Sequence, residues 1–167
     1  MSYIKTGYLE YSELESLQTL PDEKRYQEGP VAVIECVQNI PCNPCEASCK
    51  FGAIHIGSPI TNLPTIDTRK CIGCGNCIAK CPGMAIFVVN KTKGRGIASV
   101  SFPYEYYPVP KVGDKCHAVD RKGEYICDGT VSKVVNPASY DHTPVVTIDI
   151  PIEYANEVRS IERGYQP

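Results

Sequence analysis

The chain has 167 residues, of which 43% are hydrophobic and 22% charged, and its formal net charge is −2. This balance is typical of a globular protein and excludes disordered and fibrous classes, while the length allows one domain with appendages or two small modules rather than one large catalytic fold. No apolar run approaches the roughly 18 residues of a membrane span, the start lacks signal-peptide features, and no segment has a basic excess. We therefore expect a soluble cytoplasmic protein with no transmembrane segment and no nucleic-acid partner.

The first 29 residues form an acidic arm. Ser12 and Glu15 have the spacing of a capping box, Leu17 follows, and Pro21 ends the pattern. This predicts a short helix followed by an extended arm in residues 1–29. Two interpretations remain open, a frayed terminus or a strap over the core or a partner. The tyrosines of the arm favour the strap, because tyrosine suits half-hydrated contacts.

The ten cysteines are the most informative part of the composition. Reducing compartments keep thiols free, so in an intracellular chain this number favours metal ligands. Disulfides would be expected only if the protein were exported.

An internal repeat occupies residues 30–90. The first copy reads VAVIECVQNIPCNPCEASCKFGAIHI and the second reads PTIDTRKCIGCGNCIAKCPGMAIFVV. Each copy predicts an apolar strand, a cysteine-bearing loop, a short helical turn and another apolar strand. We expect two βαβ-like halves related by a pseudo-twofold axis.

The second copy carries the run Cys71-x2-Cys74-x2-Cys77-x3-Cys81, followed by a proline. A cubane iron–sulfur cluster needs thiolates that converge from one tight loop, and this spacing is the known bacterial ferredoxin pattern. Gly73 is expected to let the loop backbone pass close to a cluster and point amides at sulfur, and Gly75 likewise.

The first copy carries Cys36-x5-Cys42-x2-Cys45-x3-Cys49, which departs from that pattern twice. Three extra residues separate its first two cysteines, and Lys50 stands where proline is usual. Looping out the extra residues would still let Cys36 reach the site, so we keep it as a ligand. The alternative is a single cluster with Cys36 unused.

Zinc ribbons are the main alternative for paired C-x2-C motifs. A zinc site needs four ligands and has no use for a third and fourth cysteine in each run. The doubled runs therefore favour two cubane clusters over zinc.

Cys116 and Cys127 lie outside the repeat. A third metal site there would need two more ligands, and among histidines only His117 is close in sequence. Buried structural thiols are the favoured interpretation, because free cysteine packs as a small hydrophobe. The chain contains no nucleophile motif, phosphate-binding loop or dinucleotide fingerprint, so we expect no catalytic residue.

After a basic glycine-containing linker, the pattern changes to strands separated by turns, which predicts a β-rich module over residues 97–163. A final amphipathic segment over 154–161 predicts a helix. The expected fold class is α+β, a ferredoxin-like core with a small β-barrel or β-sandwich module and a terminal helix. The predicted strands cover residues 98–102, 115–119, 125–135 and 145–150.

These motifs identify residues 30–90 as similar to the ferredoxins with two [4Fe-4S] clusters. In that family the fourth cysteine of each run ligates the other cluster, and every iron is ligated by protein, which implies electron transfer rather than catalysis. The resemblance implies that cluster 1 takes Cys36, Cys42, Cys45 and Cys81. It implies that cluster 2 takes Cys71, Cys74, Cys77 and Cys49.

The whole chain, with VAVIEC, IPCNPCEASC and its β-rich tail, resembles the small iron–sulfur subunit of bacterial multisubunit FAD-dependent dehydrogenases that act on amino acids or opines. This implies flavoprotein partners that carry the FAD, with the β-rich module as a docking element. The nearly neutral core favours such a built-in subunit, because diffusing carriers use a strong single-sign surface. A stand-alone two-cluster ferredoxin and a zinc-stabilised structural module are the alternatives.

Overall fold

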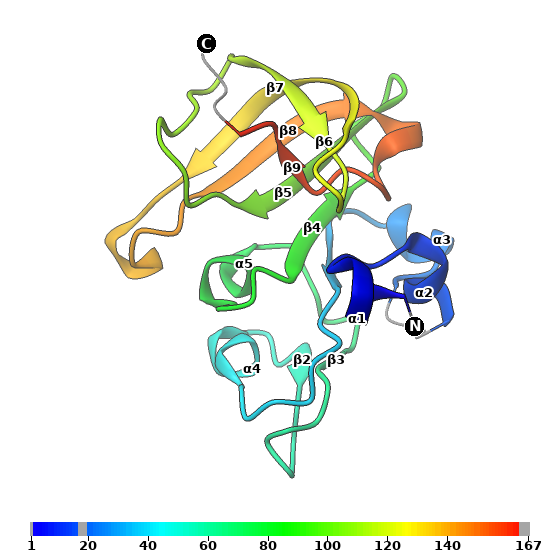
Figure 1. The fold of residues 1–167 in the computed structure, drawn as a ribbon, viewed down its shortest axis with the longest axis vertical. Helices are drawn as coiled ribbons and strands as arrows, with labels where there is room; N and C mark the ends of the chain where they lie inside the picture. The colour runs from blue at the N-terminus through cyan, green and yellow to red at the C-terminus, as the bar shows by residue number, and fades with distance from the viewer. Residues whose placement is uncertain (1, 17–19, 164–167) are drawn as a thin grey trace.

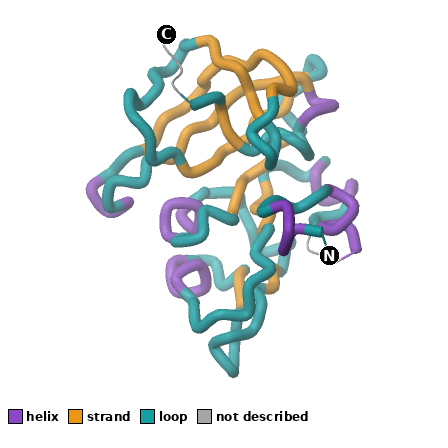
Figure 2. The backbone as a smooth tube through the Cα atoms, in the orientation of Figure 1, coloured by secondary structure: helices purple, strands orange, loops and turns teal. Residues whose placement is uncertain are grey.

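The computed structural model describes residues 2–16 and 20–163, and it has the predicted α+β composition, with a mostly antiparallel sheet and few, short helices (Figure 1, Figure 2). Within the described ranges, no helix has the length and apolar character needed to cross a membrane. The helices and helical turns are α1 (Tyr3–Thr6), α2 (Tyr11–Ser16), α3 (Glu23–Tyr26), α4 (Pro44–Ser48), α5 (Asn76–Lys80), η1 (Ala138–Tyr140) and η2 (Ile152–Tyr154). The strands are β1 (Val31–Ile34), β2 (Ile54–His55), β3 (Thr65–Ile66), β4 (Ile86–Asn90), β5 (Ile97–Pro103), β6 (Lys115–Val119), β7 (Tyr125–Val135), β8 (Val145–Pro151) and β9 (Ser160–Ile161).

One seven-stranded sheet connects the cysteine repeat with the C-terminal strands. Its order is β1-β4-β5-β8-β7-β6-β9, and a separate two-stranded sheet pairs β2 with β3. The expected linker over 91–96 is the connection of an antiparallel hairpin between β4 and β5, in which Val88 lies opposite Ser101. The strands predicted in the C-terminal half are confirmed, with bounds that agree to within one residue.

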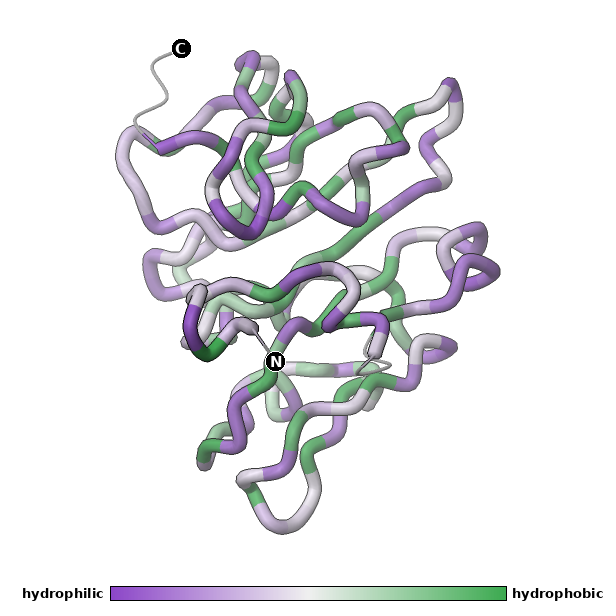
Figure 3. Tube along the Cα trace, turned by 45° about the vertical axis from the view of Figure 1, so that its right-hand side comes forward, coloured by the Kyte–Doolittle hydropathy of each residue, from purple (hydrophilic) through white to green (hydrophobic). Residues whose placement is uncertain are grey.

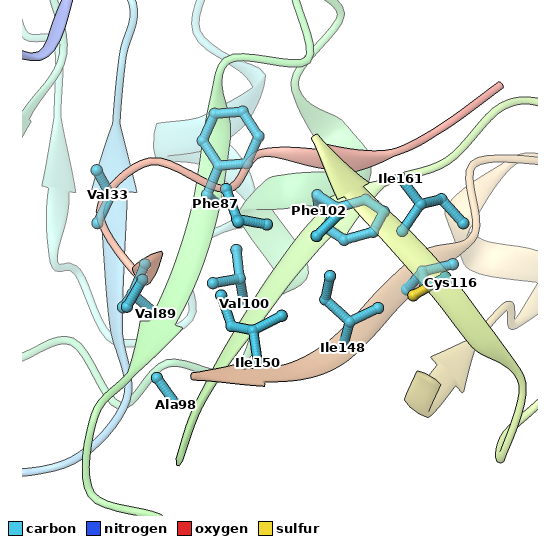
Figure 4. Close-up of a cluster of buried hydrophobic side chains, with 14 of the residues drawn as sticks. Val33, Phe87, Val89, Ala98, Val100, Phe102, Cys116, Ile148, Ile150 and Ile161 are labelled. Carbon is cyan, nitrogen blue, oxygen red and sulfur yellow. The ribbon is translucent and has the colours of Figure 1, made fainter. Parts of the chain in front are cut away.

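Strands β1 and β4 are buried on both faces, because two hydrophobic cores lie on either side of them. Val33 and Phe87 face the first core, which they share with β5 to β9 (Figure 4). Ile34 and Ile86 face the second core, which contains cysteines of both runs. Figure 3 shows the hydrophobic segments crossing the middle of the molecule. The continuous apolar sequence of these strands follows from this double burial.

The predicted C-terminal helix over 154–161 is wrong. These residues form the end of the short turn η2 and then β9, which pairs with β6 so that Ile161 lies opposite Ala118. Val158 and Ile161 are nevertheless buried in the first core. The apolar spacing thus predicts correctly which residues are buried. Pairing with strand β6, however, makes the end of this segment a strand rather than a helix.

Over residues 2–16 and 20–29, the N-terminal arm has three short helices instead of one helix and an extended segment. Ser12 does not cap a helix, because α2 already begins at Tyr11; instead the carboxylate of Glu13 accepts a hydrogen bond from the N–H of Glu10 at 3.1 Å. Leu14 is fully buried. The predicted role of Leu17 lies outside the described residues.

Arg25 attaches the arm to the second cysteine loop. Its buried guanidinium donates to the carbonyl oxygens of Thr68 and Cys71, both at 2.7 Å, and also to those of Gly29 and Pro30. These hydrogen bonds to carbonyl oxygens satisfy the N–H groups of the buried guanidinium without a carboxylate. The arm is therefore a strap fastened to the core of its own chain.

Pro30 also approaches the second cysteine loop closely, and this explains the glycine at position 73. A Cβ at Gly73 would lie 2.5 Å from the Cβ of Pro30, and the residue has φ +67°. Gly75 has a similar φ of +82°, but its nearest neighbour, in Ile78, would lie at 3.7 Å. Gly73 is thus required by the close approach of Pro30, at the start of the repeat, as well as by its backbone conformation.

A buried ion network joins the cysteine repeat, the β-rich strands and the arm. Glu35 accepts hydrogen bonds from Arg121 at 2.8 and 3.0 Å and from Arg159 at 2.7 Å. Burial raises the pKa of Glu35, but the two guanidinium groups outweigh this effect and hold the pKa below its usual value. Arg121 also lies over the ring of Tyr11, and Asn156 donates to the hydroxyl of that tyrosine.

The Gly73 contact gives a first prediction. Gly73→Ala should lower the thermal midpoint much more than Gly75→Ala, because only the former adds a clash to the cost of a positive φ, about 1–2 kcal/mol. Gly83→Ala is the matched control, since Gly83 has open space and no positive φ. Anaerobic thermal unfolding measures all three. Equal losses for Gly73→Ala and Gly75→Ala would contradict the proposed contact.

The ion network gives a second prediction. Glu35→Gln should destabilise the protein by about 3 kcal/mol, because it leaves two buried guanidinium groups without their carboxylate. Asp67→Asn serves as a control, since the Asp67–Arg69 pair is exposed and such pairs contribute little. Denaturant unfolding under anaerobic conditions measures both variants. A stability for Glu35→Gln that matches the control would show that the network contributes nothing.

Candidate functional site

Two equivalent helices present the cysteines of the two runs. Cys45 lies within α4 and Cys77 within α5, and each helix is closed by the last cysteine of its run, Cys49 and Cys81. Figure 1 shows the two helices one above the other on the same side of the molecule. All ten cysteines of the chain are free thiols.

The first thiol cavity brings together cysteines from both runs. It is lined by Cys36, Cys42 and Cys45 of the first run and by Cys81 of the second. Its wall also includes apolar side chains such as Ile34. This is the set of four that the family resemblance implies for cluster 1, and it includes Cys36 despite the longer spacing before Cys42.

The second thiol cavity has the complementary set. Cys71, Cys74 and Cys77 of the second run line it together with Cys49 of the first. Each cavity therefore receives three thiols from one run and the final thiol of the other. Cys74 is exposed, whereas Cys77 is buried.

The crowding of the thiols affects their protonation. Burial, together with the neighbouring Cys71, Cys74 and Cys49, raises the pKa of Cys77 to about 12. Burial likewise raises the pKa of Cys45 to about 11, with a contribution from Cys81. Thiolates so close together repel one another, so this arrangement favours binding of a positively charged iron centre, which stabilises the thiolate form.

Backbone amides compensate part of this cost. Burial raises the pKa of Cys49, but backbone N–H groups, beginning with that of Ala53, outweigh it and hold the pKa below its usual value. The N–H of Ala53 donates to Cys49 Sγ at 3.3 Å, and that of Ala85 donates to Cys81 Sγ at 3.4 Å. Such N–H···S bonds are those that stabilise a thiolate-ligated cluster, so the donor set of both cavities fits a cubane.

A single metal ion has different requirements. Across residues 2–16 and 20–163, no group of three or more His, Cys, Asp or Glu side chains lies close enough to hold one ion. A cubane distributes its thiolates over several irons, so this finding concerns single ions only.

Cys116 and Cys127 line neither thiol cavity. Both are buried in the first core, as predicted for structural thiols. His117 lies on the other, exposed face of β6, where its ring is 3.0 Å from Glu162. The strand alternation therefore separates His117 from the thiol that precedes it.

The sequence did not identify several residues as part of the cavities, although Tyr3 and Tyr8 are among the arm tyrosines that favoured a strap. Tyr3, Ile4 and Tyr8 of the arm line the first thiol cavity. Tyr140 of η1 packs near Cys77 at the second, and its hydroxyl donates to Asn76 at 2.9 Å. No periodicity or motif marks these positions, because the contacts are made across long stretches of sequence.

Comparison with known proteins agrees with this geometry. The 4Fe-4S binding domain family matches residues 64–87, which contain the second cysteine run. An uncharacterized ferredoxin of Methanocaldococcus jannaschii is 36% identical over 62 residues, which cover 37% of this chain and 36% of that protein. One component of the Na(+)-translocating ferredoxin:NAD(+) oxidoreductase complex of Acetobacterium woodii is 47% identical over 38 residues, 23% of this chain and 11% of that component.

A longer and weaker similarity is found in Protein Pixie of Drosophila melanogaster, with 28% identity over 106 residues, 54% of this chain and 17% of that protein. The chain thus spans between 11% and 36% of the length of these relatives. No solved structure matches it. The family match over the second cysteine run and the similarity to a protein named as a ferredoxin support an iron–sulfur role with 4Fe-4S binding.

Proposed function

We propose that this chain is an electron-transfer subunit that holds two [4Fe-4S] clusters. Cluster 1 would be ligated by Cys36, Cys42, Cys45 and Cys81, and cluster 2 by Cys71, Cys74, Cys77 and Cys49. The observation that carries the proposal is that each of two cavities is lined by four thiols, three from one run and one from the other. When bound, such clusters accept and release single electrons.

The residues of this chain have three tasks in the proposed function. The eight thiolates hold the iron, and the amides of Ala53 and Ala85 stabilise the thiolates that accept their hydrogen bonds. The apolar walls of the cavities limit access of water. Since protein thiolates satisfy every iron of such a cluster, no position remains for a substrate, which is the reason to assign electron transfer and no catalysis.

We further propose that residues 30–90 form a pseudo-twofold ferredoxin-like unit, with an arm over 1–29 and a docking module over 97–163. Three features that match between the two halves of the repeat support the pseudo-twofold axis. The helices α4 and α5 carry cysteines at matching positions. The pairing of β1 with β4 has its counterpart in that of β3 with β2. The N–H···S bonds of Cys49 and Cys81 both come from the residue four positions later.

The assembly in which the chain acts is also a proposal. Its partners would be flavoprotein subunits of a cytoplasmic dehydrogenase, which carry the FAD, and the chain would relay single electrons between this flavin and another cofactor or acceptor. A relative named as a component of an oxidoreductase complex supports a multisubunit setting.

A stand-alone, diffusible two-cluster ferredoxin is the second candidate, because another relative is named as a ferredoxin. Purification from the native source under anaerobic conditions distinguishes the two. Co-elution with flavin-containing subunits supports the built-in subunit, whereas a flavin-free monomer supports the diffusible carrier.

The proposed ligands give a third prediction. The protein reconstituted under anaerobic conditions should contain about eight iron and eight acid-labile sulfide per chain, the content of two cubanes. Content near four would contradict the first site and Cys36 in particular, and zinc alone would contradict both sites. Metal and sulfide analysis of the full chain measures this directly.

A fourth prediction separates ligands from structural thiols. Cys77→Ser should lose about half of the iron, because it removes one ligand of the second set. The double variant Cys116→Ser/Cys127→Ser should keep all of the iron and the same visible absorption, with only the modest destabilisation expected at buried positions. Loss of a spectroscopic component in the double variant would mean that these two thiols bind metal.

A further inference from the structure

The two thiol cavities differ in what covers them. Tyr3, Ile4 and Tyr8 of the arm form part of the wall of the first cavity. This part of the arm is fixed from the β-rich side, where the ammonium group of Lys122 lies 5.1 Å from the ring centre of Tyr8 and 3.4 Å from the carboxylate of Glu10. The arm thus covers part of the first cavity.

The second thiol cavity has an exposed apolar margin. Ile72 and Phe51 line this cavity, yet 54% and 46% of their surfaces remain exposed. The exposed thiol Cys74 also lies on the cavity wall. Single exposed apolar residues are common on protein surfaces, but two at the margin of a thiol site form a small patch beside the proposed cofactor.

Two exposed lysines adjoin residues of this margin in the sequence. Lys50 precedes Phe51, Lys70 precedes Cys71, and both lysines are exposed. Neither forms a salt bridge with any residue in the described part of the chain.

The acidic residues of the repeat do not neutralise these lysines. Glu35 is buried between arginines, Asp67 pairs with Arg69, and Glu46 lies 3.9 Å from His55. The net charge of the whole chain is −2, so a positive margin at this cavity is a local property.

We infer that this face, with Phe51 and Ile72 at its centre and Lys50 and Lys70 at its edge, is where a redox protein with an acidic surface docks to exchange electrons. The inference rests on the proposed function and adds the face and the kind of partner. In each encounter the partner loses one electron and the cluster held by Cys49, Cys71, Cys74 and Cys77 gains it, or the reverse. Opposite charges steer the encounter, and the apolar centre brings the partner close to the exposed thiol.

Stopped-flow measurement of electron transfer to the full-length, reconstituted protein tests the proposed docking face. Reduced flavodoxin, a small acidic flavoprotein, serves as the electron donor at low ionic strength. The double variant Lys50→Glu/Lys70→Glu should lower the second-order rate constant at least about tenfold. The charge-matched control is Lys111→Glu/Lys115→Glu, whose exposed lysines line neither thiol cavity. It should change the rate constant less than about twofold.

A basic protein gives the opposite test. Oxidised cytochrome c should accept electrons from the reduced Lys50→Glu/Lys70→Glu variant faster than from the wild type, because the reversed charges attract it. As a measurement independent of electron transfer, carbodiimide should join Lys50 or Lys70 to a carboxylate of flavodoxin, and mass spectrometry should identify these cross-links.

The outcomes separate the docking face from the proposed function. If dithionite reduces the clusters but the two double variants behave alike, or if the cross-links form at other lysines, the docking face is wrong while the electron-transfer function stands. If a protein with its full iron and sulfide content cannot be reduced at all, the proposed function itself fails.

Discussion

The paired strands β1 and β4 are the constraint on which the rest of this structure depends. They are covered on one face by the first core, shared with the β-rich strands, and on the other by the second core, which contains the cysteines. The ladder continues beyond β1 through the N–H of Glu35, which donates to the carbonyl of Ala85 at 2.8 Å. Because Cys36 follows Glu35 and the N–H of Ala85 bonds Cys81, the end of this strand pair holds two thiols of the first cavity. The position of the thiols thus depends on packing far from them.

The buried carboxylate of Glu35 is a consequence of this arrangement. A charge at the end of a strand between two cores cannot be hydrated, so it must be paired within the protein. Arg121 supplies one partner from the turn between β6 and β7, and Arg159 supplies the other from the segment before β9. Such buried pairs contribute less to stability than their short distances suggest, but they specify which segments meet. Here they fix the β-rich half and the arm beside the first thiol cavity.

The two halves of the repeat are therefore alike in sequence but different in surroundings. The arm forms part of the wall of the first cavity and holds the loop of the second through Arg25, and the margin of the second cavity includes the exposed Ile72 and Cys74. The flanking segments therefore make the surroundings of the two cavities different.

The sequence by itself determined the cysteine runs, the strand positions of the C-terminal half and the assignment of Cys116 and Cys127 to a buried core, because spacing and alternation are local properties. It could not determine the C-terminal strand β9, where pairing with β6 replaced the helix that the apolar spacing predicted. The roles of Arg25, Glu35 and Tyr140 were equally hidden, since their partners lie 43, 124 and 64 residues away in the chain. Only the tertiary structure brings such groups together, because the free energy of burying a charge or a hydroxyl depends on what surrounds it and not on its neighbours in sequence.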